Sequence, residues 1–247
     1  MTSDDLVSVV IPIYNSQETI KETLQSLINQ THKNWEALVV FDQGTTDDSL
    51  KIAKSFNDPR IVILNSMGKS LAAARNLALL RAQGNWITFL DSDDLWKPQK
   101  LQIQLQMMKD HNWDFSVTGF SRINQQSRII SAVSMPKAKT DYWDLLKNNS
   151  ISCLTVMISR KALGQSQFAD SHQEDFIMWL EILKKGFTCQ GIMQELALYR
   201  VLPNSRSSRV NRPLNRWKIM RQREKLSFPL ALYYWLTYVF SAVAKRM

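Results

Sequence analysis

Short apolar runs and helix-like segments alternate along the first half of the chain. The runs are rich in β-branched or aromatic residues and cover residues 7–11, 35–41, 61–64 and 86–90, the first of them ending at Pro12. Such runs predict buried strands, and strands that alternate with helices predict a mostly parallel sheet with helices on both faces. The sequence therefore predicts an α/β fold, in which ligands bind beyond the carboxyl ends of the strands.

Helix signals fill the gaps between these runs. Apolar residues at three- and four-residue spacing predict a helix over 17–29, and acids after Thr46 open a second helix. Ser70 is expected to cap a third helix that ends near Gly84, and Pro98 to open a fourth. The second half is less regular, with strands predicted over 113–120, 128–134, 151–159 and 196–201 and helices over 141–147 and 174–185.

The length and composition suit one sizeable core, because 45% of the 247 residues are hydrophobic. We expect a catalytic domain over residues 1–210, with a nucleotide-binding half over about 1–112 and an acceptor half over about 113–210. A basic and then apolar helical tail is expected over 211–247.

Two features favour a reduced, cytosolic setting. The chain has only two cysteines, Cys153 and Cys189, too few for a disulfide framework at this length. The polar and acidic residues 1–5 and the short apolar run after them predict no secretory signal peptide.

The net charge of +9 is concentrated in the tail. Between Arg200 and Lys225 there are nine basic residues and one acid, and Lys245 and Arg246 add two more, which leaves about −1 for the first 199 residues. A high net positive charge is typical of nucleic-acid or anionic-surface binders. Because the body carries almost no net charge, its electrostatics give no indication of a nucleic-acid partner.

Three polar clusters follow predicted strands, at residues 12–15, 42–44 and 91–94. The third, Asp91-Ser92-Asp93-Asp94, places several carboxylates so close that they would repel one another in a folded site. A divalent cation such as Mg²⁺ or Mn²⁺ relieves that repulsion and also bridges the phosphates of a nucleotide diphosphate. The alternative is a solvated turn with helix-capping acids.

Each of several other polar residues has a functional and a structural interpretation. Tyr14 is a candidate for stacking on a base or a rim aromatic, and the 42–44 cluster is a base and ribose site or an ordinary turn. Arg75 could reach a diphosphate or pair with a neighbouring acid. The pair Glu174-Asp175 opens a predicted helix, where acids are favoured in any case, so the residues alone favour the structural reading.

As a set, these motifs resemble family 2 glycosyltransferases, which have the GT-A fold. The resemblance covers roughly residues 6 to 210 and rests on segments in family order: 9–15, Gln30-Thr31, 42–47, Ala74-Arg75-Asn76, 89–94, Glu174-Asp175 and Tyr199-Arg200. More narrowly, residues 153–158 and the ending resemble small bacterial enzymes of the teichuronic-acid and exopolysaccharide type.

The resemblance implies roles for particular positions. Asp93 would ligate the metal, Mn²⁺ or Mg²⁺, Asp94 would help, and Asp175 would be the catalytic base. The nucleotide-sugar would bind at Pro12, Tyr14, Asp42, Gln43, Arg75, Asp91 and Ser92. The base would deprotonate an acceptor hydroxyl as it attacks, and the sugar would be transferred with inversion in one displacement.

Two positions depart from the family pattern. Gln43 stands where an acid that contacts the base is usual, and Leu202 stands where many relatives have a histidine. Because of Gln43, the choice of nucleotide is less constrained. Our hypothesis is that Arg200, Arg206 or Arg209 supplies charge to the diphosphate in place of that histidine.

The end of the tail, 226–244, has no charged residue, contains many aromatic residues and has basic residues on both sides. This pattern favours a helix lying in the plane of a membrane interface, attracted to anionic lipid by the basic segment 212–225. Packing on the enzyme body or a partner, and a true membrane span, are the alternatives.

Taken with the resemblance, these features predict an inverting, metal-dependent glycosyltransferase. The expected reaction moves a sugar from a nucleotide-diphosphate donor, a UDP-sugar, to a hydroxyl of a lipid-linked saccharide in bacterial surface polysaccharide synthesis. The enzyme would be peripheral, on the cytoplasmic face of the inner membrane. Alternatives are a non-catalytic scaffold relative, or a nucleotidyltransferase, whose glycine- and lysine-rich loop is missing at residues 12–16.

Overall fold

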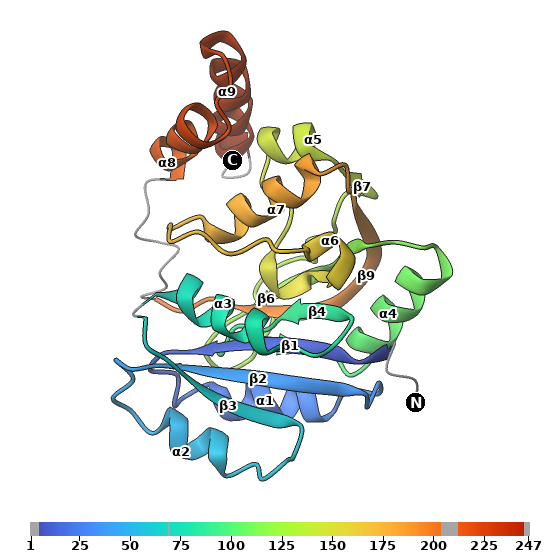
Figure 1. Cartoon of the computed structure of the whole chain (residues 1–247), viewed down its shortest axis with the longest axis vertical. Helices are drawn as coiled ribbons and strands as arrows, with labels where there is room; N and C mark the ends of the chain where they lie inside the picture. Colours follow the sequence, from blue (N-terminus) through green and yellow to red (C-terminus); the bar gives the residue numbers. More distant parts are fainter. Residues whose placement is uncertain (1–4, 69, 204–211, 245–247) are drawn as a thin grey trace.

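The structure is a computed structural model, and it describes residues 5–68, 70–203 and 212–244. The described residues form a nine-stranded sheet in the order β3-β2-β1-β4-β8-β6-β9-β5, with β7 on β9 (Figure 1). The strands are β1 (Val7–Ile13), β2 (Trp35–Asp42), β3 (Ile61–Ser66), β4 (Trp86–Phe89), β5 (Leu95–Trp96), β6 (Phe115–Ile123), β7 (Lys139–Thr140), β8 (Met157–Ser159) and β9 (Cys189–Arg200).

Most strands of this sheet run in one direction. β3, β2, β1 and β4 are parallel neighbours. β8 is antiparallel to both β4 and β6, so β6 runs the same way as β4, and β9 is parallel to β6. Only β5, β7 and β8 run the other way. The mostly parallel α/β fold that the sequence predicts is confirmed.

Helices cover both faces of the sheet. β1 shows the two-residue period: Val10 joins the apolar cluster that includes α3 and α7, whereas Val9 and Ile11 join the cluster that includes α1 and α4. The helices are α1 (Ile20–Ile28), α2 (Ser49–Lys54), α3 (Leu71–Arg81), α4 (Lys100–Asp110), α5 (Tyr142–Lys147), α6 (Arg160–Leu163) and α7 (Glu174–Lys184). Ser70 caps α3 as predicted, because its side chain accepts a hydrogen bond from the N–H of Ala73.

β1 does not end at Pro12 but continues to Ile13. The carbonyl of Val10 accepts a hydrogen bond from the N–H of Leu90, so the backbone polar groups of Val10 point toward β4. The backbone of Pro12, two residues further along the strand, is directed to the same side. β4 pairs with β1 only as far as Val10. At Pro12 this side of β1 is therefore beyond its pairing with β4. The strand accommodates the proline because no ladder hydrogen bond is lost there.

The second half differs more from prediction. Residues 128–134 are not a strand; their backbone pairs with β6 through the isolated bridges Ile123–Ile129 and Phe120–Ser134. In the segment predicted as a strand over 151–159, a 3₁₀ turn (Cys153–Thr155) precedes the short β8. β9 starts at Cys189, earlier than predicted. A Cβ at Gly191 would lie 2.0 Å from the carbonyl oxygen of Lys137, so this part of β9 depends on a close backbone approach.

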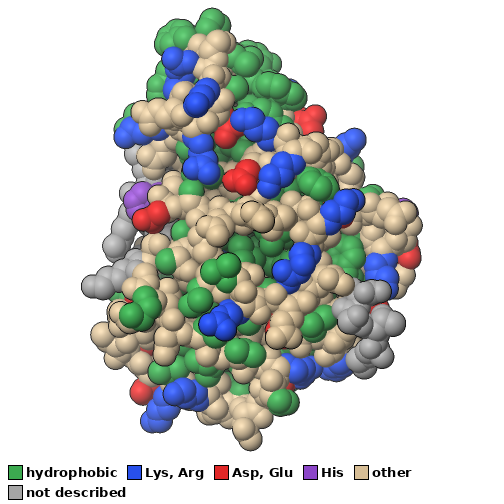
Figure 2. All heavy atoms as spheres, viewed as in Figure 1, with side chains coloured by type: hydrophobic (Ala, Val, Ile, Leu, Met, Phe, Trp, Pro, Cys, Tyr) green, Lys and Arg blue, Asp and Glu red, His purple; other side chains and the backbone are tan. Residues whose placement is uncertain are grey.

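The tail packs on the body through one of its faces. It comprises α8 (Arg212–Lys218), the π-helical turn η4 (Ile219–Arg223) and α9 (Phe228–Ala244). Its buried apolar residues join the core cluster of α5 and α7; they are Ile219, Met220, Leu226, Ala231 and Tyr234. Figure 2 shows hydrophobic side chains gathered at the top of the molecule, over α8 and α9, with Lys and Arg side chains beside them. Among the described residues, no helix has the length and apolarity needed to cross a membrane.

Candidate active site

The acidic run lies directly after β4, at the carboxyl end of the parallel strands. Its three carboxylates have different surroundings: Asp94 is buried, whereas Asp91 and Asp93 are partly exposed. Burial, together with the charge of Asp91, raises the pKa of Asp93 to about 6. Burial and the charge of Asp93 raise the pKa of Asp94 well above its usual value. Both pKa shifts arise first from burial and then from the like charges confined in one place.

A buried arginine on α3 links this run to the start of α7. Nη2 of Arg75 lies 2.6 Å from Oδ1 of Asp91, and Nη1 lies 2.9 Å from Oε1 of Glu174. Burial opposes the charge of Arg75, but the two carboxylates, Asp91 foremost, outweigh it and raise the pKa of Arg75. The guanidinium predicted to reach a diphosphate is thus directed at two acids of the protein.

Asp175 lies in the first turn of α7, next to Glu174. Its Oδ1 accepts a hydrogen bond of 2.7 Å from the N–H of Phe176. Burial, and then the negative charge of Glu174, raise the pKa of Asp175. The Arg75–Glu174 contact therefore brings the helix end that carries Asp175 to the acidic run.

Tyr14, Asp42 and Gly44 lie together where β1 and β2 end. The N–H of Gly44 donates to Oδ1 of Asp42 at 2.7 Å. A Cβ at Gly44 would lie 3.1 Å from that oxygen and 3.2 Å from Cε2 of Tyr14, so a glycine suits this approach. Tyr14 is 60% exposed, so its ring is open to solvent. Pro12 is buried in β1, and Gln43 is exposed, its amide donating to Sδ of Met67 at 3.0 Å.

The start of α1 fixes the loop of the acidic run. The hydroxyls of Ser16 and Ser92 lie 2.6 Å apart. The carbonyl of Ser92 accepts hydrogen bonds from the hydroxyls of Thr19 (2.8 Å) and Thr23 (3.0 Å). The chain after β1 and the chain after β4 are thereby held side by side.

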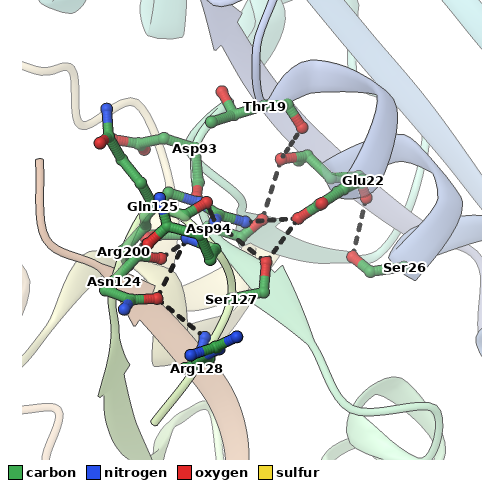
Figure 3. A network of polar contacts seen from close by, with 12 residues as sticks. Thr19, Glu22, Ser26, Asp93, Asp94, Asn124, Gln125, Ser127, Arg128 and Arg200 are labelled. Atoms are coloured by element: carbon green, nitrogen blue, oxygen red, sulfur yellow. Dashed lines mark hydrogen bonds and ion pairs between the residues drawn. The ribbon is translucent and has the colours of Figure 1, made fainter. Parts of the chain in front are cut away.

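A second buried arginine, Arg200 at the end of β9, holds the acidic run from another side (Figure 3). Its backbone N–H donates to Oδ1 of Asp94 at 2.8 Å, and its Nε donates to the carbonyl of Asp93 at 2.7 Å. Nη2 donates to Glu22 on α1 at 2.7 Å, and Nη1 donates to the carbonyl of Gln125 at 2.8 Å.

The guanidinium of Arg200 thus contacts the protein through all three of its nitrogens, which speaks against our hypothesis that it supplies charge to the diphosphate. Arg206 and Arg209, the other two residues of that hypothesis, lie outside the described residues. Arg200 belongs to the sequence motif Tyr199-Arg200, but no sequence pattern indicates its partner Glu22.

The residues of the acidic run fit a divalent cation. Burial and the charge of Asp91 raise the pKa of Asp93, and the positive charge of Arg200 does not offset them. Among the described residues, no group of three or more His, Cys, Asp or Glu side chains forms a metal cage. Mg²⁺ is commonly held by one or two carboxylates together with substrate phosphates, and Asp93 beside Asp91 offers that donor set.

Comparison with known proteins decides the family. The model for "Glycosyl transferase family 2" matches residues 8–167. The chain belongs to this family. A Bacillus subtilis glycosyltransferase named for teichuronic acid biosynthesis, TuaG, is 39% identical over 98% of this chain and 98% of its own. The Escherichia coli UDP-Glc:alpha-D-GlcNAc-diphosphoundecaprenol beta-1,3-glucosyltransferase WfgD is 38% identical over 98% of this chain and 96% of its own.

Solved structures of more distant proteins share the fold. TarS 1–349 of Staphylococcus aureus, in complex with UDP-GlcNAc, aligns with a TM-score of 0.69 at 22% identity, over 87% of this chain and 64% of that one. The mannosyltransferase PcManGT of Pyrobaculum calidifontis, in complex with GDP-Man and Mn²⁺, aligns with a TM-score of 0.69 at 16% identity, over 94% and 68%. The predicted family, GT-A fold and glycosyltransferase activity are thereby confirmed.

Proposed function

We propose that this glycosyltransferase moves a sugar, with inversion, from a UDP-sugar to a hydroxyl of a lipid-linked saccharide during bacterial surface polysaccharide synthesis. It would act as a peripheral enzyme on the cytoplasmic face of the plasma membrane. The names of relatives as similar as WfgD support the donor and acceptor classes. The observation that carries the proposal is the bridge from Asp91 through Arg75 to Glu174, because it joins a donor-side acid to the helix turn that holds Asp175.

The donor would bind across the ends of β1, β2 and β4. The exposed ring of Tyr14 suits stacking on uracil, with Asp42 and Gln43 at the edge of the base or the ribose and Pro12 beneath. Asp91 and Ser92 would lie beside the ribose and the sugar. Asp93 would hold Mn²⁺ or Mg²⁺, which, when bound, supplies positive charge against the departing diphosphate.

Arg75 would act on the donor through Asp91 rather than by touching the diphosphate. Its two ion pairs fix the Asp91 carboxylate in one orientation, since a guanidinium presents its donors in a rigid fork. Orientation of this kind lowers the barrier, because the reacting groups are already placed when the substrates bind.

Asp175 would be the base. Its carboxylate would accept the proton of the acceptor hydroxyl while that oxygen bonds to the anomeric carbon and the bond to the diphosphate breaks. Its raised pKa suits this work, because a base is most effective when its pKa approaches the working pH. A single displacement of this kind inverts the anomeric configuration.

A panel of nucleotide-sugars with Mn²⁺ and acceptor tests the proposal against its alternatives. Release of UDP from a UDP-sugar is the expected result. Release of pyrophosphate would instead identify a nucleotidyltransferase, and the absence of turnover with every donor and acceptor would favour a non-catalytic scaffold.

A further inference from the structure

α9 has two apolar faces, and within residues 5–68, 70–203 and 212–244 only one of them packs on the protein. Ala231 and Tyr234 are buried against the body, and Tyr234 stacks on Trp143 of α5 at 5.7 Å between ring centroids. Tyr233, Leu236 and Phe240 follow one another at three- and four-residue spacing. They are offset by two residues from Ala231 and Tyr234, so they lie on another face of the helix. They are 54%, 39% and 70% exposed. We refer to these three residues as the tail face.

The tail is anchored, so the exposure of this face is a property of the folded protein. Glu224 accepts a hydrogen bond from the hydroxyl of Tyr142 at 2.8 Å and pairs with Lys184 of α7 at 3.0 Å. Nε1 of Trp235 donates to the carbonyl of Pro213, which ties α9 to α8. An exposed cluster of large apolar residues on an anchored helix marks an interaction surface.

Exposed cations accompany the tail face. Lys218, Arg221, Arg223 and Lys225 all lie on the surface between the end of α8 and the start of α9. Glu224, the acid among them, is partly buried and occupied by Tyr142 and Lys184. Residues 226–244 contain no charge at all. The partner must therefore present both an apolar layer and negative charge.

We propose that the tail face docks on the surface of an anionic lipid bilayer, with Tyr233, Leu236 and Phe240 entering the interface and the four cations contacting acidic headgroups. A bilayer offers the two chemistries side by side. A second copy of the tail would bring cations against cations, which disfavours self-association.

The docked tail also bears on the active site, and this step rests on the proposed function. The guanidinium of Arg216, buried on α8, lies 3.3 Å from the ring centroid of Phe176 and 4.6 Å from that of Tyr238 on α9. Phe176 directly follows Asp175. The bilayer-facing helices thus brace the helix turn that carries the proposed base, so docking would hold that turn in a fixed position relative to the membrane that contains a lipid-linked acceptor.

Co-sedimentation of the full-length protein with vesicles tests the proposal. Vesicles of phosphatidylglycerol and phosphatidylethanolamine should pellet the wild type at low salt, and vesicles of phosphatidylcholine alone should bind far less. The double variant Leu236→Ser, Phe240→Ser should weaken binding at least about tenfold. The triple variant Lys218→Gln, Arg223→Gln, Lys225→Gln should weaken vesicle binding about a hundredfold, because each cation near an anionic surface contributes a similar share of the binding free energy.

Matched controls lie at the other end of the molecule or on another helix. Leu80→Ser removes a leucine that is 72% exposed on α3, and Lys51→Gln, Lys54→Gln removes two exposed cations of α2. Both controls should bind vesicles like the wild type. Thermal melting of every variant establishes that it is folded.

The proposal is overturned if the wild type stays in the supernatant with anionic vesicles, or if folded tail variants bind as well as the wild type. A soluble dimer that Phe240→Ser dissociates would overturn it in favour of a second copy. UDP release with a water-soluble acceptor separates this proposal from the proposed function. The tail variants should keep that turnover while they lose vesicle binding. A wild type that binds vesicles but shows no turnover would contradict the proposed function and leave the docking proposal standing.

Discussion

Arg75 and Asp91 form an ion pair of 2.6 Å in which the arginine side chain is 2% exposed and the carboxylate 33% exposed. The same guanidinium holds Glu174, so one buried cation compensates two acids from different parts of the chain. Through these two ion pairs, Arg75 connects the loop after β4 to the start of α7.

The variant Arg75→Met should destabilise the protein by about 3–5 kcal/mol, because it leaves Asp91 and Glu174 without their shared buried partner. Urea unfolding measures the change. The control Lys161→Met breaks an exposed pair with Asp114 and should change the free energy of unfolding by less than about 1 kcal/mol. Equal effects of the two variants would show that Arg75 has no special role in the fold.

The pH dependence of turnover should report on Asp175. Its folded-state pKa is raised, so the carboxyl keeps its proton to a higher pH than a free aspartate, and kcat/KM should rise as the pH increases through that pKa. The charge of Glu174 contributes to the shift. In Glu174→Gln, the acid limb of the kcat/KM profile should therefore move to lower pH. A limb that stays in place, or moves to higher pH, would exclude Asp175 as the group that titrates there.

Arg200 should act as a positioning residue for Asp93, the proposed metal ligand. Arg200→Lys removes the guanidinium, which donates hydrogen bonds to the carbonyl of Asp93, to the carbonyl of Gln125 and to the carboxylate of Glu22. Affinity for Mn²⁺ should fall about 10- to 100-fold, as for other residues that orient metal ligands. Calorimetric titration with Mn²⁺ and UDP checks this. Arg128→Lys, an exposed change at the same turn, is the control, and equal Mn²⁺ affinity in both variants would contradict the assignment.

Tyr14 should stack on the base of the donor. Tyr14→Ala should weaken UDP binding by about 1–3 kcal/mol, whereas Tyr14→Phe, which keeps the ring, should bind within a few-fold of the wild type. Fluorescence or calorimetric titration with UDP distinguishes the two. If Tyr14→Ala binds UDP as tightly as Tyr14→Phe, the ring does not contact the base.

The parts of the site that sequence reasoning predicted follow from local pattern. Tyr14, Asp42 and Asp91 each come just after a strong apolar strand, and parallel strands bring their carboxyl ends to one edge. The β-branched runs were long enough to identify those strands from a single sequence. The alternation of strands and helices then predicted the fold.

The connections between those residues could not be predicted in the same way. Arg75 and Glu174 are 99 residues apart, and Arg200 and Glu22 are 178 apart, so no local spacing indicates either pair. Strands β5 and β7 have two residues each, too few to show a period. The tail shows a further limit, because an apolar pattern does not distinguish the face that packs on the protein from the face that stays exposed.

The most direct test of the account is transfer to a lipid-linked saccharide, measured with the wild type and Asp175→Asn. With Mn²⁺ and an α-linked UDP-sugar, the wild type should give a product that is one sugar heavier by mass spectrometry and β-linked by NMR. Asp175→Asn should bind UDP normally but transfer about 10²- to 10⁴-fold more slowly, as expected for loss of a general base. An α-linked product, or an Asp175→Asn variant with the wild-type rate, would contradict the account.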